Sequence, residues 1–171
     1  LISLLVVLFA CSPQSPQSTF DPHGPIARSQ LNLFWIIFWA GLIVFVIVQG
    51  ALLYTVVKFR RTSREVRPKQ IHGHTALELA WTIAPALVLA VVAIPTILVQ
   101  FDISREPGPD ALKISVTAHQ WWWEFDYEDL GIKTANELHI PVGRDINVTL
   151  KSNDVIHSFW IPKLAGKLDI I

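Results

Sequence analysis

Two long stretches without charge set the strongest limit on what this chain can fold into. Leu33 to Val57 spans 25 residues and Leu79 to Phe101 spans 23, and neither contains Asp, Glu, Lys or Arg. A helix rises about 1.5 Å per residue, so each stretch exceeds the roughly 30 Å hydrocarbon core of a bilayer. Pro85 and Pro95 fall in the second stretch, where membrane helices tolerate proline. The sequence predicts a transmembrane hairpin over 33–101; two buried core helices would need a large set of soluble partners.

Basic residues between the two stretches predict which side of the membrane their loop occupies. Loop 58–78 carries six of them: Lys58, Arg60, Arg61, Arg64, Arg67 and Lys69. Its acidic residues are Glu65 and, at its end, Glu78. An excess of Lys and Arg in a short loop favours the cytoplasmic side. Both termini are therefore expected on the periplasmic or outer side of a bacterial plasma membrane.

Cys11 is the only cysteine, so an intrachain disulfide is excluded. It follows an apolar run from Leu1 to Phe9 and the small residue Ala10. This pattern is typical of a bacterial lipobox, in which the cysteine thiol receives a lipid anchor. We expect residues 1–11 to be this signal region and 12–32 an exported tether; a plain secretory signal or a chance free cysteine are the alternatives. Because the chain starts without Met and ends in a strand-like run, we expect a fragment truncated at both ends.

The C-terminal part changes to strand-like alternation after a turn-rich linker at 102–111. We expect strands at the following ranges: 112–117, 121–127, 137–140, 146–152, 159–161 and 167–171. Short alternating runs separated by turn signals predict an antiparallel β-sandwich. About 60 residues, 112–171, are too few to close such a fold, which usually needs seven or more strands. An incomplete sandwich is the prediction.

Three consecutive tryptophans stand out in this region. Trp121, Trp122 and Trp123 follow His119 and Gln120, and a run of acidic residues begins directly behind them. In a strand, Trp121 and Trp123 would share one face and Trp122 the other. Aromatic rings beside negative charge favour a surface where a partner docks or an electron passes. An aromatic strand half buried in the sandwich is the alternative.

Glu78 is a carboxylate at the start of the second predicted span. A carboxylate at a membrane edge is a candidate proton relay, because its burial is costly and tunable. A snorkelling surface glutamate, or a charge that favours the helix dipole, explains it equally well. The residue pattern leaves these interpretations open.

The histidines give weaker signals. His157 lies in a predicted loop, and a copper site there would also need thiolate or thioether ligands. The chain has no Met, and its one cysteine is far away in sequence. His72 and His74 form a weak pair in a cationic loop, and His119 and His139 have no companion ligand. From the residues alone, a structural role is favoured for these histidines.

Three motifs in this order resemble subunit II of the haem–copper oxidases, specifically of the cytochrome c oxidase type. The first is His-Gly-x-x-x-Leu-Glu-x-x-Trp-Thr-x-x-Pro over 72–85, the second His-Gln-Trp-x-Trp over 119–123, and the third Asp-Val-Ile-His-Ser-Phe over 154–159. The resemblance runs from about Leu33 to the last residue. It implies a membrane-anchored α + β fold: a two-helix transmembrane hairpin followed by a cupredoxin-like antiparallel β-sandwich, here incomplete.

The resemblance also implies a function. Such subunits accept electrons from cytochrome c at a dinuclear copper centre, CuA. They pass them to haem in subunit I for oxygen reduction coupled to proton translocation. The family ligands are two His, two Cys, a Met and a Glu carbonyl, of which only His157 has a counterpart here. We therefore expect the fragment to be inactive alone and not to bind the copper pair. Subunits I and III, cytochrome c and the membrane are the implied partners, with no nucleic acid.

Residue roles follow from the same resemblance. Trp121 matches the position where electrons enter from cytochrome c, and Glu78 matches the entrance of a proton pathway into subunit I. Asp126 and Asp129 match acids that dock basic cytochrome c, and Asp154 is a further candidate. Trp122 departs from the Tyr that is common at its position.

Two alternatives remain open. Subunit II of a quinol oxidase shares the hairpin and sandwich but lacks CuA, and in that branch the position of His157 is typically not His. A non-redox, membrane-anchored binding protein with a β-sandwich head is the other alternative. His157 and the motif beginning at His119 favour the cytochrome c branch.

Overall fold

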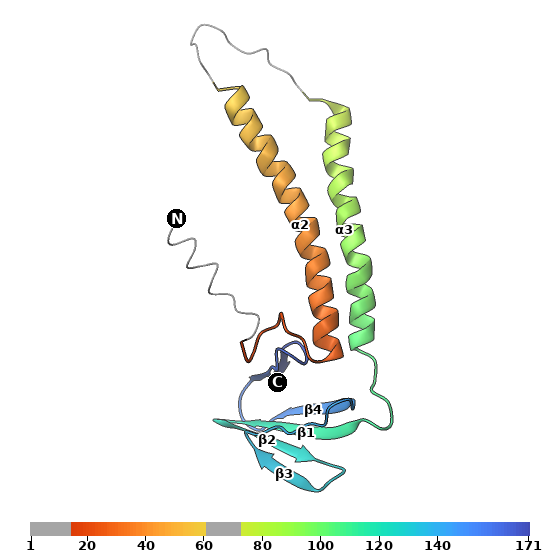
Figure 1. Ribbon diagram of the computed structural model, residues 1–171, viewed down its shortest axis with the longest axis vertical. Helices are drawn as coiled ribbons and strands as arrows, with labels where there is room; N and C mark the ends of the chain where they lie inside the picture. Colours follow the sequence, from red (N-terminus) through yellow and green to blue (C-terminus); the bar gives the residue numbers. More distant parts are fainter. Residues whose placement is uncertain (1–14, 61–72) are drawn as a thin grey trace. The chain divides into compact units, whose positions relative to one another are not determined.

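A computed structural model describes residues 15–60 and 73–171 (Figure 1). The chain divides into two compact units, one formed by Gln30–Phe101 and the other by the residues before Gln30 together with Asp102–Ile171. Each unit is considered by itself. Cys11, His72 and the central part of the basic loop lie outside the described residues.

Two long helices dominate the first unit. Helix α2 spans Pro25–Lys58 and helix α3 spans Thr75–Ile103, and both are long and apolar enough to cross a membrane. Their apolar side chains lack cover from the described protein: Leu53 is 64% exposed and Leu89 68%. Such surfaces require lipid or other subunits around them. The two predicted spans are confirmed, although α2 also takes in residues 25–32 of the expected tether.

Helix α2 begins earlier than the uncharged stretch because its first residues suit a helix start. Pro25 occupies the first helical position, where its fixed φ and missing N–H carry no penalty. In α3, Pro85 and Pro95 lie inside a continuous helix. The tolerance of membrane helices for proline accounts for that continuity.

The described residues of the second unit form six strands. They are β1 Leu112–His119, β2 Trp122–Tyr127, β3 Ile132–Ala135, β4 Ile146–Ser152, β5 His157–Phe159 and β6 Leu168–Ile170. One sheet has the order β3-β2-β1-β4, and β5 pairs with β6 in a second sheet. The β-rich, cupredoxin-like class is as expected. The first sheet is nevertheless mixed rather than wholly antiparallel, because β1 and β4 run parallel.

One predicted strand is absent from the described part of this unit, and one observed strand was not predicted. No strand forms at 137–140, and β3 forms instead immediately after the turn that contains Gly131. Gly131 adopts a φ of 65°, a left-handed conformation that favours glycine. The turn brings β3 antiparallel to β2, pairing Phe125 with Thr134.

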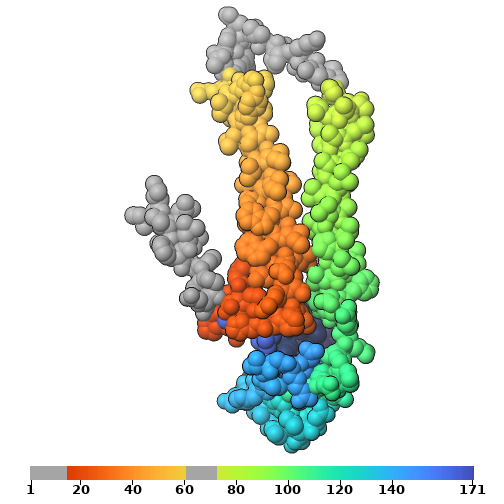
Figure 2. Space-filling view, turned by 45° about the vertical axis from the view of Figure 1, so that its right-hand side comes forward, coloured from red at the N-terminus to blue at the C-terminus, as the bar shows by residue number. Residues whose placement is uncertain are grey.

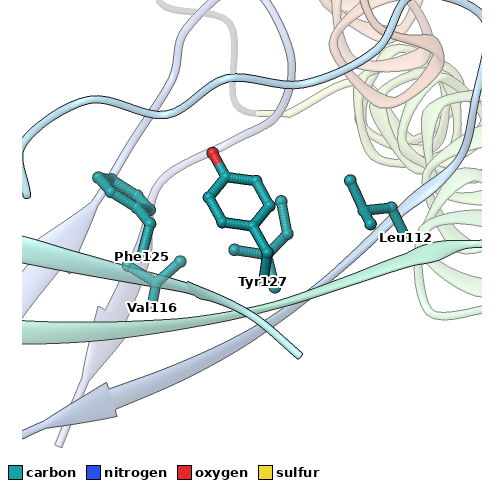
Figure 3. Close-up of a cluster of buried hydrophobic side chains, with 5 residues drawn as sticks. Leu112, Val116, Phe125 and Tyr127 are labelled. Atoms are coloured by element: carbon teal, nitrogen blue, oxygen red, sulfur yellow. The ribbon is translucent and has the colours of Figure 1, made fainter. Parts of the chain in front are cut away.

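The hydrophobic core lies on one face of β1 and β2. Ile114 sits opposite Tyr127 and Val116 opposite Phe125, and all four are nearly inaccessible. In Figure 3 the labelled side chains project from the same side of the two strands. Phe159 of β5 packs against this cluster, so the two sheets share the core.

The residues just before α2 are docked on the loop between β5 and β6. Lys163 Nζ donates to Asp21 Oδ2 at 2.6 Å, which lowers the pKa of that carboxyl. The Gly24 N–H donates to the Lys163 carbonyl, and the Ala27 N–H donates to the Leu164 carbonyl. A Cβ on Gly24 would lie 2.5 Å from the Leu164 oxygen, so only glycine fits there. Figure 2 shows the red N-terminal residues next to the blue C-terminal segment.

Candidate functional site

Trp121 lies in the tight turn between β1 and β2. The register pairs His119 with Trp122, which leaves Gln120 and Trp121 as a two-residue hairpin turn, with a cis peptide bond between them. The Trp121 side chain is 91% exposed. The prediction that Trp121 starts a strand and shares a face with Trp123 is therefore wrong. The turn presents the Trp121 ring to solvent instead.

His157 opens strand β5 rather than lying in the loop predicted for it, and it stands beside an aromatic cluster. Its ring lies edge-on to Trp123 at a centroid distance of 5.8 Å, and Trp123 in turn contacts Phe159 at 5.4 Å. The His157 side chain is 18% exposed. Trp123 is thus the tryptophan in ring contact with His157, whereas Trp121 lies at the surface of the same hairpin.

Asp154 joins the Trp121 turn to His157. Its Oδ2 accepts the Gln120 N–H at 2.6 Å, and its Oδ1 accepts the Val155 N–H at 2.6 Å. Its Oδ1 also lies 2.6 Å from His157 Nε2. These hydrogen bonds, that from His157 first, lower the pKa of Asp154 to about 2. The carboxylate therefore links His157 to the turn that carries Trp121, through the backbone of Gln120.

Lys133 on β3 forms an ion pair with one predicted docking acid, Asp126, and in the part of the chain that the structure describes it leaves another, Asp129, without such a pair. Lys133 Nζ lies 2.8 Å from Glu124 Oε1 and 3.1 Å from Asp126 Oδ2. The hydrogen bond that Lys133 donates to Glu124 lowers the pKa of the carboxyl and raises the pKa of the Lys133 ammonium. Asp129, in the following turn, is exposed and has no ion-pair partner among the described residues. Sequence reasoning missed Lys133 because it missed β3.

His119 and His139 occupy positions that suit the structural role expected for them. The His119 ring stacks on Trp122 at 4.3 Å, with 4° between the ring planes. His119 Nε2 is buried 3.5 Å from Glu124 Oε2. The His139 backbone N–H donates to the Tyr127 hydroxyl at 2.8 Å, and that hydroxyl donates to the His139 carbonyl at 3.0 Å.

The described residues do not by themselves fit a copper pair. Within residues 15–60 and 73–171, no group of three or more His, Cys, Asp or Glu side chains could hold a metal ion. His157 offers one imidazole, whose Nε2 is already occupied by Asp154. A dinuclear copper centre needs soft sulfur ligands as well. The chemistry available here is that of one metal-competent imidazole inside a hydrogen-bonded network.

Glu78 lies in the first turn of α3, where its carboxylate folds back on the helix start. Its Oε1 accepts the His74 N–H at 3.3 Å, and the Leu77 N–H donates to His74 Nδ1 at 3.4 Å. A Cβ on Gly73, whose φ is 66°, would lie 3.1 Å from Glu78 Oε1. The capping interaction is present, and it is compatible with either interpretation of Glu78.

Comparison with known proteins identifies close sequence relatives. Residues 14–99 match the family described as cytochrome c oxidase subunit II, transmembrane domain. Cytochrome c oxidase subunit 2 of Alkalihalophilus pseudofirmus is 36% identical over 174 residues, which cover 98% of this chain and 51% of the relative. The protein of the same name in Bacillus subtilis is 35% identical over 179 residues, covering 99% of this chain and 50% of the relative.

Quinol oxidases are found among the relatives as well. Quinol oxidase subunit 2 of Bacillus spizizenii is 36% identical over 178 residues, covering 97% of this chain and 54% of the relative. The chain thus spans about half the length of the curated relatives it matches. Equal identity to both groups means that overall similarity does not distinguish one electron donor from the other.

Proposed function

Because this chain belongs to the cytochrome c oxidase subunit II family, we propose that its exported domain accepts electrons from a basic cytochrome c at Trp121. One observation carries the proposal. The exposed Trp121 ring stands on a turn that Asp154 ties directly to His157. The backbone N–H of Gln120, next to Trp121, and the metal-competent imidazole of His157 share the Asp154 carboxylate, which places an exposed aromatic ring on a turn anchored to that imidazole. The electrons would then pass to the oxygen-reducing subunit I.

The remaining family features belong to the same proposal. His157 would contribute one imidazole to CuA, with the sulfur ligands placed further along the longer chains of the family. CuA, when bound, supplies one-electron redox chemistry; the residues described here position the donor. The chain would lie in a bacterial plasma membrane with its β-domain outside, anchored by two spans and by lipidation at Cys11. Subunits I and III, the haem of subunit I and proton translocation complete the proposed assembly.

Substitution of the acidic residues tests directly whether cytochrome c docks on this domain. In the assembled oxidase, Asp129→Asn is expected to raise the KM for cytochrome c several-fold at low salt. Asp129 is exposed and unpaired among the described residues, whereas Asp126 is partly neutralised by Lys133. The matched variant Asp126→Asn should therefore have a smaller effect. Electrostatic steering weakens with ionic strength, so both effects should fade as salt rises.

Steady-state kinetics with cytochrome c across a range of ionic strengths measures this expectation. If neither salt nor the Asp129 substitution changes the KM, the proposed electrostatic docking is contradicted.

Glu78 is proposed to stand at the entrance of a proton pathway into subunit I. Glu78→Gln should slow steady-state turnover about tenfold or more, because the amide cannot release a proton. The amide oxygen can still accept the His74 N–H, so the helix cap is retained. Turnover and proton uptake by the purified oxidase are the measurements. Normal turnover in Glu78→Gln would instead assign Glu78 to capping alone.

A further inference from the structure

We propose that Asp154 is a positioning residue, which locks the Trp121 turn and the His157 imidazole into one hydrogen-bonded unit. The residue would act inward, on the geometry of the electron relay, rather than outward on a docking partner. The consequence for electron transfer rests on the proposed function. The hydrogen bonds themselves do not, and the two parts can be tested separately.

The carboxylate of Asp154 is surrounded by nitrogen donors. The Gln120 N–H reaches Oδ2 from a turn 34 positions earlier in the chain, and the Val155 N–H reaches Oδ1 from the next residue. His157 Nε2 reaches the same Oδ1. An ionised carboxylate only accepts hydrogen bonds, and charge-assisted bonds are about twice as strong as neutral ones. Three contacts of 2.6 Å therefore fix two separate segments to one side chain.

This arrangement also orients the His157 ring. Because the carboxylate only accepts, the proton of the imidazole lies on Nε2, facing Asp154. In the neutral imidazole, Nδ1 then keeps its lone pair and becomes the nitrogen available to a metal. A carboxylate partner commonly sets the tautomer and the ring direction of a metal-binding histidine in this way.

The exposure of the acids favours the inward role. The Asp154 side chain is only 27% exposed, and both of its oxygens are engaged. Asp129, by contrast, is an exposed acid with no ion-pair partner among the described residues. The acid suited to meeting a cationic partner is therefore Asp129, which makes it the natural control.

The substitution Asp154→Asn isolates the positioning role. An amide NH2 at the place of either oxygen would face a backbone N–H, that of Gln120 at one place and that of Val155 at the other. One backbone donor must then lose its acceptor, whichever way the amide turns. Asp154→Glu keeps the charge but displaces the carboxylate by one methylene. Positioning is sensitive to both changes, whereas docking by charge is sensitive only to the first.

The experiment compares Asp154→Asn, Asp154→Glu and Asp129→Asn in the full-length subunit within its oxidase. Hydrogen–deuterium exchange followed by mass spectrometry reports on the turn at Gln120 and on the segment 154–157. We expect exchange to rise about tenfold in both segments for the two Asp154 variants, and to stay unchanged for Asp129→Asn. With cytochrome c, kcat should fall in the Asp154 variants, whereas Asp129→Asn should raise KM.

The outcomes separate the two levels of the proposal. Unchanged hydrogen exchange in Asp154→Asn would overturn the positioning role. The role would also be overturned if Asp154→Glu behaved like the wild type and Asp154→Asn changed only the KM for cytochrome c. Raised exchange with unchanged kcat would confirm positioning and contradict the proposed electron relay. If Asp154→Asn does not assemble, the exchange and kcat of Asp154→Glu decide the question alone.

Discussion

Trp121→Phe is expected to slow electron transfer from cytochrome c at least about tenfold, a barrier increase of about 1.4 kcal/mol. Trp121 is 91% exposed, and its turn is bonded to the carboxylate that contacts His157. The smaller phenyl ring presents less π surface to a docked donor and reaches less far from the turn. Stopped-flow oxidation of reduced cytochrome c by the assembled oxidase measures the rate directly.

Trp122→Phe is the matched control for this prediction. Trp122 belongs to the same aromatic run but stacks on His119 rather than facing a partner freely. Its substitution should leave the rate of electron transfer close to wild type. Equal slowing in both variants would mean that the aromatic run acts through folding rather than through a relay at Trp121.

The second large effect concerns the core of the β-domain. Ile114→Ala should lower the free energy of unfolding by about 2–5 kcal/mol, because it removes buried methyl groups from a packed site. Ile114 is 1% exposed and belongs to β1, the strand that lies between β2 and β4 in the sheet. Denaturant unfolding of the β-domain in the full-length chain, followed by near-ultraviolet circular dichroism, gives the difference.

Ile132→Ala provides the comparison for the core substitution. Ile132 carries the same side chain on β3 but is 51% exposed, so its truncation should cost only about 0.5 kcal/mol. Similar losses at both positions would contradict the assignment of the core to the β1–β2 face. Unchanged stability in Ile114→Ala would contradict it more strongly.

The two helices could be predicted from sequence because one property, the length of an uncharged apolar stretch, indicates a membrane-spanning helix. An uncharged stretch longer than the bilayer has few alternatives, and both predicted spans fall inside α2 and α3. The helix ends could not be predicted as well, because polar residues such as Gln30 can extend a helix without changing the apolar stretch. Local capping, as at His74, decided where α3 begins.

The strands were harder because short alternating runs depend on turns. The Ile146–Ser152 strand was predicted at its observed bounds. Trp121 was placed in a strand because the period-two alternation of side chains was assumed to continue through the aromatic run. The hairpin between β1 and β2 needs two turn residues, and Trp121 is one of them. Gly131 was a local sequence signal for β3, because glycine readily adopts the left-handed conformation that the turn before β3 has.

The Asp154 network could not be predicted from spacing. Gln120 and Asp154 are 34 positions apart, and they meet because β4 runs parallel to β1 and ends beside it. Parallel pairing of this kind leaves no periodic signal that links the two segments. The family motifs marked His157 and Trp121 separately, and the structure adds the carboxylate that joins them.

The electron donor is the most direct measure of the proposed function. The assembled oxidase that contains the full-length subunit should be assayed for oxygen consumption with reduced cytochrome c and, separately, with a quinol. The proposal predicts rapid, salt-sensitive turnover with cytochrome c and little with quinol. Rapid turnover with quinol and none with cytochrome c would contradict it and place the chain with the quinol oxidases.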